Sequence, residues 1–343
     1  MKYVSLLLFS LLLIFSLHAC SGAVPRQQPA KTAKHPAWPP PPARCRIAWQ
    51  REIRNISDYR PRQGFWQRLG RLLAGEREVT MVKPYGVYVD EQDRLFILDR
   101  GLRRIFMINQ QQDTYKVVPP GDDHPLTSPV DLTGDDQGTI YITDSQLGKI
   151  YCYRLGDDRL TEFHTVNLSR PTGIAYSRHY QQLYVADSLA QQIVVLGLDG
   201  HERFRFGSQG REPGQFNAPT AISVNRKGEV LVTDALNGRI QIFAADGHFI
   251  RQFGRPGDTS GSFAKPKGIA ADSDGNIYVC DALFDAVQIF DPRGRLLLAF
   301  GDSGFQPGQF WMPAGIFIDK HDTVYIADTY NQRVQIFRYL KKE

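Results

Sequence analysis

Residues 266–290 read PKGIAADSDGNIYVCDALFDAVQIF, and this stretch decides the fold. It contains three short runs rich in β-branched and aromatic residues, which begin at Pro266, Ile277 and Ala286. Gly, Asp and Asn residues separate the runs. Runs of this length between turn-forming residues are typical of β-strands. The stretch therefore predicts a meander of strands, three or four in each unit.

The same pattern recurs six times along the chain. The opening proline recurs at Pro84, Pro129, Pro171, Pro219, Pro266 and Pro313. The aspartate that ends the second run recurs at Asp99, Asp144, Asp187, Asp234, Asp281 and Asp328. Six copies with a period in the forties are typical of a solenoid or a propeller. Because a radial array of four-stranded antiparallel blades covers strand edges and accounts for this period, we predict an all-β, six-bladed β-propeller over residues 83–340.

The repeated unit is similar to the NHL repeat family over residues 83–338. The resemblance is carried by Pro-x-Gly-Ile-Ala, then Tyr-Val-x-Asp, then Gln-Ile-Phe, matched most closely in the copies that open at Pro266 and Pro313. Three copies also contain a connection from Phe-Gly to Phe-x-x-Pro, beginning at Phe206, Phe253 and Phe300. One departure is Asp131, which replaces the usual Gly. The resemblance implies a propeller that contacts protein, carbohydrate or nucleic acid.

The N-terminus resembles the signal of a bacterial lipoprotein. Lys2 precedes an apolar run that ends in Leu17-His18-Ala19-Cys20, which resembles a lipobox. We therefore expect residues 1–19 to be a signal peptide and Cys20 to carry a lipid. Cleavage after Ala23 is the alternative. Either cleavage predicts an exported protein; with the lipid, it is anchored on the periplasmic or outer-surface side of a bacterial membrane.

Residues 20–44 are rich in proline and are expected to form an extended tether. Residues 45–82 follow, with a strand candidate at residues 46–53 and a short amphipathic helix predicted over residues 65–73. The last repeat stops after its third strand, near Leu340. We therefore predict that the strand within residues 45–82 supplies the outer strand of the last blade and covers its edge.

The chain has 343 residues and a formal net charge of +5. The positive charge is local, because residues 20–80 contain 12 Lys and Arg against four Asp and Glu. Residues 81–343 contain 28 basic and 32 acidic residues. A propeller with this balance and an export signal is not expected to bind nucleic acid; the basic segment is suited to anionic lipid or envelope polymer.

The repeated aspartates are expected to cap turn amides rather than to catalyse a reaction. Asp272 with Asp274, and Asp131 with Asp135 and Asp136, are likewise interpreted as hairpin-turn residues and not as calcium ligands. No catalytic, cofactor or metal site is predicted. Peptidyl-amidoglycolate lyases, which resemble NHL propellers, bind metal through several histidines. Here His179, His201, His248 and His321 lie in turn sequences, so a shared zinc is not expected.

A binding face is predicted from the turns that follow the repeated aspartates. Each turn contains an apolar residue, and in a propeller these turns share one end of the channel. The candidates are Leu102, Leu147, Leu189, Leu236, Leu283, Phe284 and Tyr330. Exposed together, they form an apolar ring suited to a protein or peptide. The alternative is that each side chain folds onto the neighbouring blade.

The sequence therefore favours an exported, lipid-anchored NHL-repeat propeller that acts as a non-enzymatic binding scaffold at the bacterial cell envelope. Its partner is expected to be an envelope protein, a peptide or a carbohydrate, with membrane contact through the lipid. The alternative function is a metal-dependent lyase or hydrolase of the peptidyl-amidoglycolate lyase type, with its site in the central channel. The innermost residues expected to line that channel are Tyr85, Val130, Thr172, Thr220, Lys267 and Ala314.

Overall fold

The computed structural model describes residues 36–40, 42–59, 79–118, 125–157, 159–163 and 166–341. The predicted signal peptide, Cys20 and the helix predicted over residues 65–73 lie outside these ranges. Within them, no helix has the length and apolar character needed to cross a membrane.

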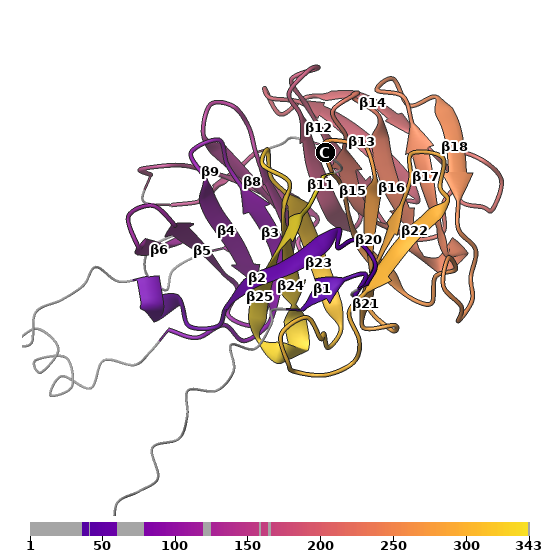
Figure 1. Ribbon diagram of the computed structural model, residues 1–343. Helices are drawn as coiled ribbons and strands as arrows, with labels where there is room; N and C mark the ends of the chain where they lie inside the picture. The colour runs from indigo at the N-terminus through magenta and orange to yellow at the C-terminus, as the bar shows by residue number, and fades with distance from the viewer. Residues whose placement is uncertain are drawn as a thin grey trace, which may run out of the picture. The chain divides into compact units, whose positions relative to one another are not determined.

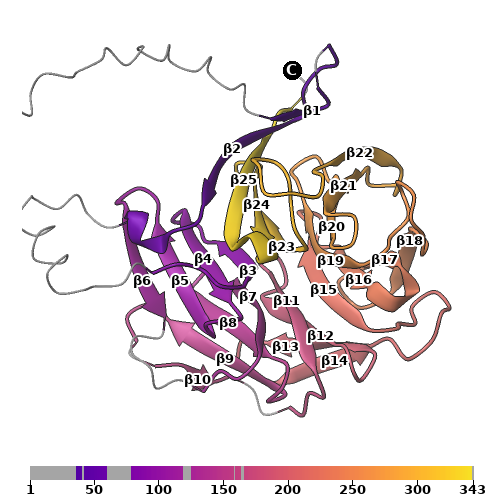
Figure 2. The ribbon, with the colours of Figure 1, turned by 90° about the horizontal axis from the view of Figure 1, so that it is seen from below.

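Six antiparallel sheets surround a central channel, as predicted (Figures 1 and 2). The innermost strands are β3 (Pro84–Val89), β7 (Pro129–Gly134), β11 (Pro171–Ser177), β15 (Pro219–Val224), β19 (Pro266–Ala271) and β23 (Pro313–Ile318). The second strands are β4 (Arg94–Asp99), β8 (Thr139–Asp144), β12 (Gln182–Asp187), β16 (Val230–Asp234), β20 (Ile277–Asp281) and β24 (Thr323–Asp328). The third strands are β5 (Arg104–Asn109), β9 (Lys149–Arg154), β13 (Gln192–Gly197), β17 (Arg239–Phe243), β21 (Ala286–Phe290) and β25 (Arg333–Tyr339).

The outer strands complete the blades. They are β6 (Thr114–Val118), β10 (Thr161–Glu162), β14 (Glu202–Phe206), β18 (Phe249–Phe253), β22 (Leu296–Phe300) and β2 (Ile47–Ile53). The last blade has a fifth strand, β1 (Ala37–Trp38). Three short 3-10 turns are η1 (Ile56–Tyr59), η2 (Ala235–Asn237) and η3 (Thr329–Asn331).

The apolar core lies between neighbouring blades. One cluster joins Tyr141 and Ile150 of the second blade to Leu183 and Val194 of the third. Five further clusters fill the other interfaces between neighbouring blades. Because each middle strand is covered on both faces, its sequence is a continuous apolar run and not an alternating one. All six residues of β8 are buried in this way.

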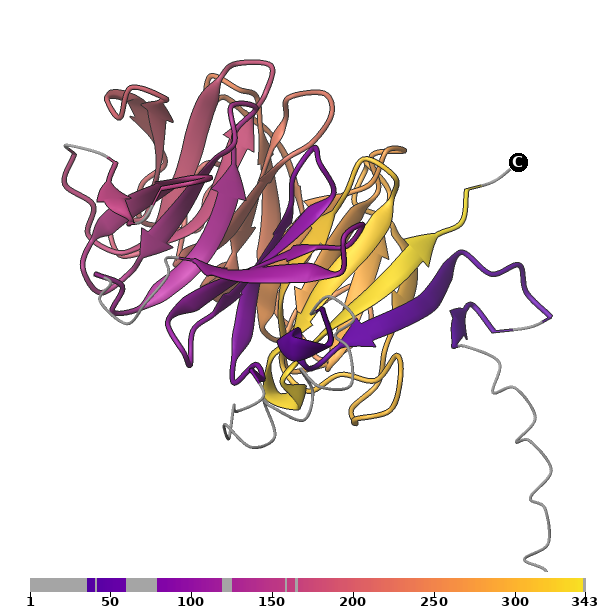
Figure 3. The ribbon, with the colours of Figure 1, turned by 90° about the vertical axis from the view of Figure 1, so that its left-hand side faces the viewer.

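The last blade is closed by the N-terminal strand β2, which pairs with β25 (Figure 3). Glu52 of β2 contacts the fully buried guanidinium of Arg333 at 2.5 Å. Trp49 donates a hydrogen bond from Nε1 to Oε1 of Gln335 at 3.0 Å. The predicted closing strand is therefore confirmed. The end of the segment expected to be a tether also joins the sheet, because Ala37 pairs with Ala48.

The Phe-Gly connections are held by close backbone packing. Gly207 has a φ of +92°, and a Cβ at this position would lie 2.4 Å from the ring of Phe216. Phe216 is fully buried between blades. A glycine is therefore required where the chain leaves the outer strand and passes over this ring. Gly254 over Phe263 and Gly301 over Phe310 repeat the arrangement.

Three cysteines are in the described part of the chain, and all three are free thiols. Cys280 is buried in β20, at a position that alanine occupies in two other repeats, Ala186 and Ala327. Cys45 donates a hydrogen bond to the carbonyl of Ile47.

Candidate functional site: a central channel with two different mouths

The two ends of the channel are defined by the turns of the blades. One end, here called the hairpin face, contains the turns between first and second strands. The other, the Asp-turn face, contains the turns that follow the six repeated aspartates. Pairing of Pro84 with Asp99 and of Val89 with Leu95 places these turns at opposite ends of the first blade. The other blades share this arrangement.

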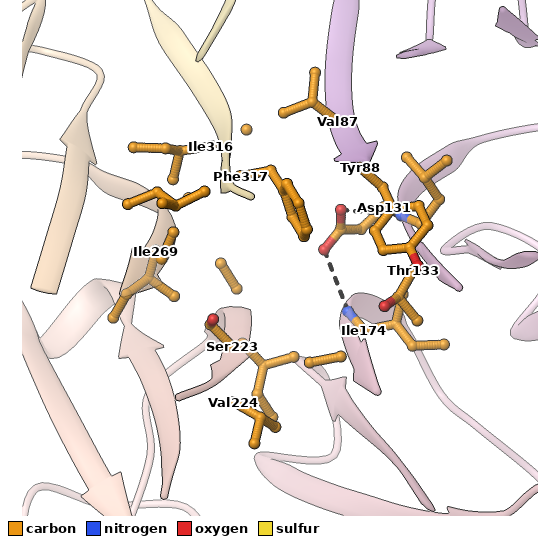
Figure 4. Close-up of a pocket in the computed structure, with 18 of the residues that line it drawn as sticks. Val87, Tyr88, Asp131, Thr133, Ile174, Ser223, Val224, Ile269, Ile316 and Phe317 are labelled. Carbon is orange, nitrogen blue, oxygen red and sulfur yellow. Dashed lines mark hydrogen bonds between the residues drawn. The ribbon is translucent and has the colours of Figure 1, made fainter. Parts of the chain in front are cut away.

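A cavity of about 550 Å³ occupies the channel and opens towards the hairpin face (Figure 4). Its wall combines aliphatic side chains, such as Val87 and Ile269, with polar ones, such as Thr133 and Ser223. Five of the six residues predicted to line the channel do so: Tyr85, Val130, Thr220, Lys267 and Ala314. The side-chain oxygen of Thr220 is buried without a hydrogen-bond partner among the described residues. A cavity of this size and mixed lining is suited to a small ligand.

Asp131 is a carboxylate in the wall of this cavity (Figure 4). Its two oxygens accept hydrogen bonds from the backbone N–H groups of Leu132 at 3.0 Å and Ile174 at 3.3 Å. Burial raises the pKa of Asp131 to about 7, although both hydrogen bonds oppose this shift. The interpretation of Asp131 as a hairpin-turn residue was wrong, because it lies on the innermost strand β7. Asp135 does cap the turn, through the amides of Gln137 and Thr139.

The mouth of the cavity at the hairpin face is charged but balanced. Arg178 contacts Glu91 and Asp136, each at 2.6 Å. Lys320 lies 3.3 Å from Asp93 and donates a hydrogen bond to the carbonyl of Glu91. These contacts connect four blades across the rim, the first, second, third and last. Cations and carboxylates therefore neutralise one another at this end.

The repeated aspartates cap turns, as predicted. Asp99 is fully buried and accepts hydrogen bonds from the amides of Val82, Lys83, Gly101 and Leu102, at 2.6 to 3.1 Å. Asp144, Asp187 and Asp281 make the same kind of contact. Asp272 likewise caps its hairpin through the amides of Asp274 and Asn276, at 2.9 Å. These carboxylates therefore have a structural role, as acceptors for the amides of turns.

The apolar residues of the predicted ring lie in the turns of the Asp-turn face. Six of them are exposed: Leu102, Leu147, Leu189, Leu236, Leu283 and Tyr330. Their exposed fractions range from 36% at Leu102 to 69% at Leu236. Phe284 is half-buried. The ring residues therefore present apolar surface on this face, to very different extents, and their role in binding stays a prediction.

Two further aromatic residues on this face were missed from the sequence. Trp311 is 52% exposed and stacks on Tyr330, with ring centroids 5.5 Å apart. Phe305 is 69% exposed, and its carbonyl accepts a hydrogen bond from Arg333 at the start of β25. Both belong to the long connection before Pro313. Each of the two could have been found in the sequence as an aromatic residue at a position outside the repeat pattern.

The residues that the structure describes do not form a metal centre. Within the described ranges, no group of three or more His, Cys, Asp or Glu side chains is placed to hold a metal ion. The four turn histidines are exposed at the surface: His179, His201, His248 and His321. Two further histidines that lie between blades in the sequence, His124 and His164, are outside the described residues.

Comparison with known protein families assigns the chain to a family. The model of the SMP-30/Gluconolactonase/LRE-like region matches residues 66–264, more than half of the sequence. The chain belongs to the SMP-30/gluconolactonase/LRE-like family. The NHL repeat model matches residues 310–337 of this family member, and a β-propeller repeat model matches residues 249–280. The resemblance to NHL repeats is therefore confirmed.

Solved structures share the fold of this SMP-30/gluconolactonase/LRE-like chain at low identity. An auxiliary nutrient binding protein from Bacteroides thetaiotaomicron has a TM-score of 0.62 at 16% identity, covering 76% of this chain and 70% of its own. A streptogramin B lyase has a TM-score of 0.58 at 16% identity, covering 76% and 95%. A catalytically inactive histidine-to-alanine variant of virginiamycin B lyase from Staphylococcus aureus, solved with quinupristin, has a TM-score of 0.55 at 15% identity, covering 75% and 95%. The TM-scores show that these proteins share the fold of this chain.

Proposed function

We propose that this propeller is a non-enzymatic binding protein whose Asp-turn face receives a protein partner. The observation that supports this most is the apolar ring, in which every blade contributes one exposed large apolar side chain. Apolar side chains gathered at one end of a soluble domain are typical of an interaction surface. Trp311 and Tyr330 supply aromatic area of the kind that dominates binding energy.

A protein suits this surface better than a carbohydrate. Five members of the ring are leucines, whose aliphatic side chains pack against apolar residues and offer no hydrogen bond to sugar hydroxyls. A binding role also agrees with the structural likeness to an auxiliary nutrient binding protein.

The location proposed for this protein is the bacterial cell envelope, on the periplasmic or outer-surface side of the membrane. The lipobox-like sequence that ends at Cys20 supports a lipid anchor. Because the lipid would be joined to the sulfur of Cys20 by a thioether, membrane attachment would depend on this side chain. In membrane fractionation, Cys20→Ser is expected to move the protein from the membrane to the soluble fraction. Unchanged sedimentation with membranes would contradict the anchor.

The ring itself is tested by replacing three of its residues with serine: Leu236, Leu283 and Phe284. Loss of apolar area is expected to abolish co-purification of the partner from envelope extracts without lowering the melting temperature. The control is Tyr180→Ser, because Tyr180 is also an exposed large apolar residue, at 47%, but lies in a turn of the hairpin face. Equal recovery of the same partner by the triple variant and the control would contradict the proposal.

A lyase or hydrolase acting in the channel is the second candidate. It is favoured by Asp131, whose carboxyl has a pKa of about 7 inside a cavity of about 550 Å³. A group that titrates near neutral pH is suited to general acid–base chemistry. Metal analysis of the purified protein tests the metal-dependent form of this candidate: stoichiometric zinc or calcium favours the enzyme, whereas metal-free protein contradicts a metal-dependent reaction.

A further inference from the structure

A second cavity, of about 420 Å³, opens on the Asp-turn face at the other mouth of the channel. It shares Gly101, Ala282 and Tyr330 with the turns that bear the apolar ring, so it lies within that ring. Four basic side chains line it: Lys83, Arg100, Lys265 and Lys267. Among the residues that the structure describes, no acidic side chain lines it. We call these four residues and the cavity around them the basic pocket.

The four cations have no carboxylate partner among the described residues. Two of them are positioned by an aromatic ring instead. The guanidinium of Arg100 lies 4.7 Å from the ring centroid of Tyr85, and the ammonium of Lys267 lies 5.9 Å from it. Lys267 also donates a hydrogen bond to the hydroxyl of Tyr85 at 3.4 Å. Cation–π contact holds these groups in place but does not neutralise them.

At the opposite mouth of the channel, on the hairpin face, cations are paired with carboxylates. There Arg178 and Lys320 contact the carboxylates of Glu91, Asp136 and Asp93. At the basic pocket the same types of side chain converge without such partners. Concentrated like charge in a concave site raises the local potential and attracts an ion of opposite sign.

The four cations do not serve to neutralise the buried aspartates. Asp99 and Asp281 lie beneath the pocket, yet the hydrogen bonds to their carboxylates come from backbone amides. Where the repeat does use a cation, the contact is direct, as between Arg239 and Asp234 at 2.8 Å. The side chains of Lys83 and Lys265 are exposed and make no such contact.

We propose that the basic pocket binds an anionic oxygen group, a carboxylate or a phosphate. Thr127, Ser128 and Tyr85 add hydroxyl groups to its lining. Charge-assisted hydrogen bonds from Lys and Arg are the strong contacts that such a group accepts. This inference rests on the proposed function and also specifies the partner. The partner presents an anionic group to the centre of the Asp-turn face and apolar side chains to the ring around it.

The test uses the purified full chain and three small probes, phenyl phosphate, benzoate and neutral benzyl alcohol, titrated by calorimetry. We expect the anions to bind and the alcohol not to bind, with weaker binding at higher salt because the contact is electrostatic. Lys265→Gln combined with Lys267→Gln is expected to weaken anion binding about tenfold. The control is Lys227→Gln, which removes an exposed charge on the hairpin face and is expected to change nothing.

The two anions distinguish the source of the group. Tighter binding of phenyl phosphate indicates a phosphate, and tighter binding of benzoate indicates a carboxylate, such as a peptide terminus. The inference is overturned if neither anion binds better than benzyl alcohol, or if the folded double variant binds both as the native protein does. Failure of this inference would not contradict the proposed role of the apolar ring. That role is tested separately, by serine variants that retain all four cations.

Discussion

At the scale of single residues, the repeated aspartates have two kinds of partner. Asp99 and Asp187 rely on backbone amides. Asp234 and Asp328 add a buried arginine, Arg239 and Arg333, five residues later. Burial raises the pKa of the Asp328 carboxyl, and the hydrogen bonds from Trp311, Asn331 and Arg333 oppose that rise. The carboxylate is therefore sensitive to loss of its arginine.

Arg333→Met tests this dependence. The change leaves the buried carboxylate of Asp328 without its cation, whereas Glu52 keeps its contact with Arg54. An uncompensated buried charge costs about 3–5 kcal/mol of unfolding free energy. The measurement is urea denaturation. The matched control is Arg338→Met, an exposed arginine of the same strand, which is expected to change stability by no more than about 0.5 kcal/mol. Similar losses in the two variants would contradict the account.

Asp131 gives the stability of the fold a pH dependence. Its pKa is about 7 in the folded state because of burial, against about 4 in an unfolded chain. The folded protein therefore holds this proton over a range where the unfolded chain releases it. The stabilisation is fully present below about pH 4 and is lost as pH rises through about 7.

Asp131→Asn is expected to remove this dependence. Relative to the variant, the native chain should lose about 2–4 kcal/mol of unfolding free energy between pH 4 and pH 8. Asp157→Asn, at an exposed aspartate, is the control and should follow the native curve. Parallel curves for native protein and Asp131→Asn would show that this carboxyl is not buried as described.

The sequence predicted the roles of the repeated aspartates because their spacing puts each of them at the same turn. It did not predict the role of Asp131. The change from the repeat's glycine to aspartate was visible, but a register shift between Pro129 and Leu132 directs this side chain towards the channel and the amide of Ile174. Periodicity locates strands and does not determine the local geometry of such a bulge.

At the scale of elements, the closing strand β2 joins the two ends of the ring. Ile53 of β2 packs in the cluster between the last and first blades. Ile47 packs in the cluster between the fifth and last blades. Removing this strand exposes both clusters and the edge of β25. The strand was predictable because the last repeat lacked a fourth run, whereas the two residues of β1 are too few to form a pattern.

Deleting residues 44–56 is expected to lower the melting temperature sharply, because two interblade cores and the Arg333–Glu52 contact are lost together. Point variants refine the test in thermal denaturation. Ile53→Asp places a carboxylate in a core position and should cost about 3 kcal/mol or more, whereas Gln50→Asp, exposed on the same strand, should cost about 0.5 kcal/mol or less. An unchanged melting curve after the deletion would rule out closure by β2.

At the scale of the whole propeller, the two mouths of the channel differ in charge and in polarity. The hairpin face is bounded by ion pairs, whereas the Asp-turn face combines unpaired cations with exposed leucines. The leucines were predictable because they occupy one position in each repeat. The basic pocket was not, since Lys83 and Arg100 meet Lys265 and Lys267 only when the ring closes and brings the first and fifth repeats to the same mouth.

The central claim is that the Asp-turn face, and not the hairpin face, receives the partner. Site-specific photo-crosslinking in living cells tests it most directly, with the photoreactive side chain placed at Leu236 on one face or at Tyr180 on the other. The account predicts a discrete cross-linked complex from position 236 and none from position 180. Cross-linking of the same partner from position 180 alone would contradict it.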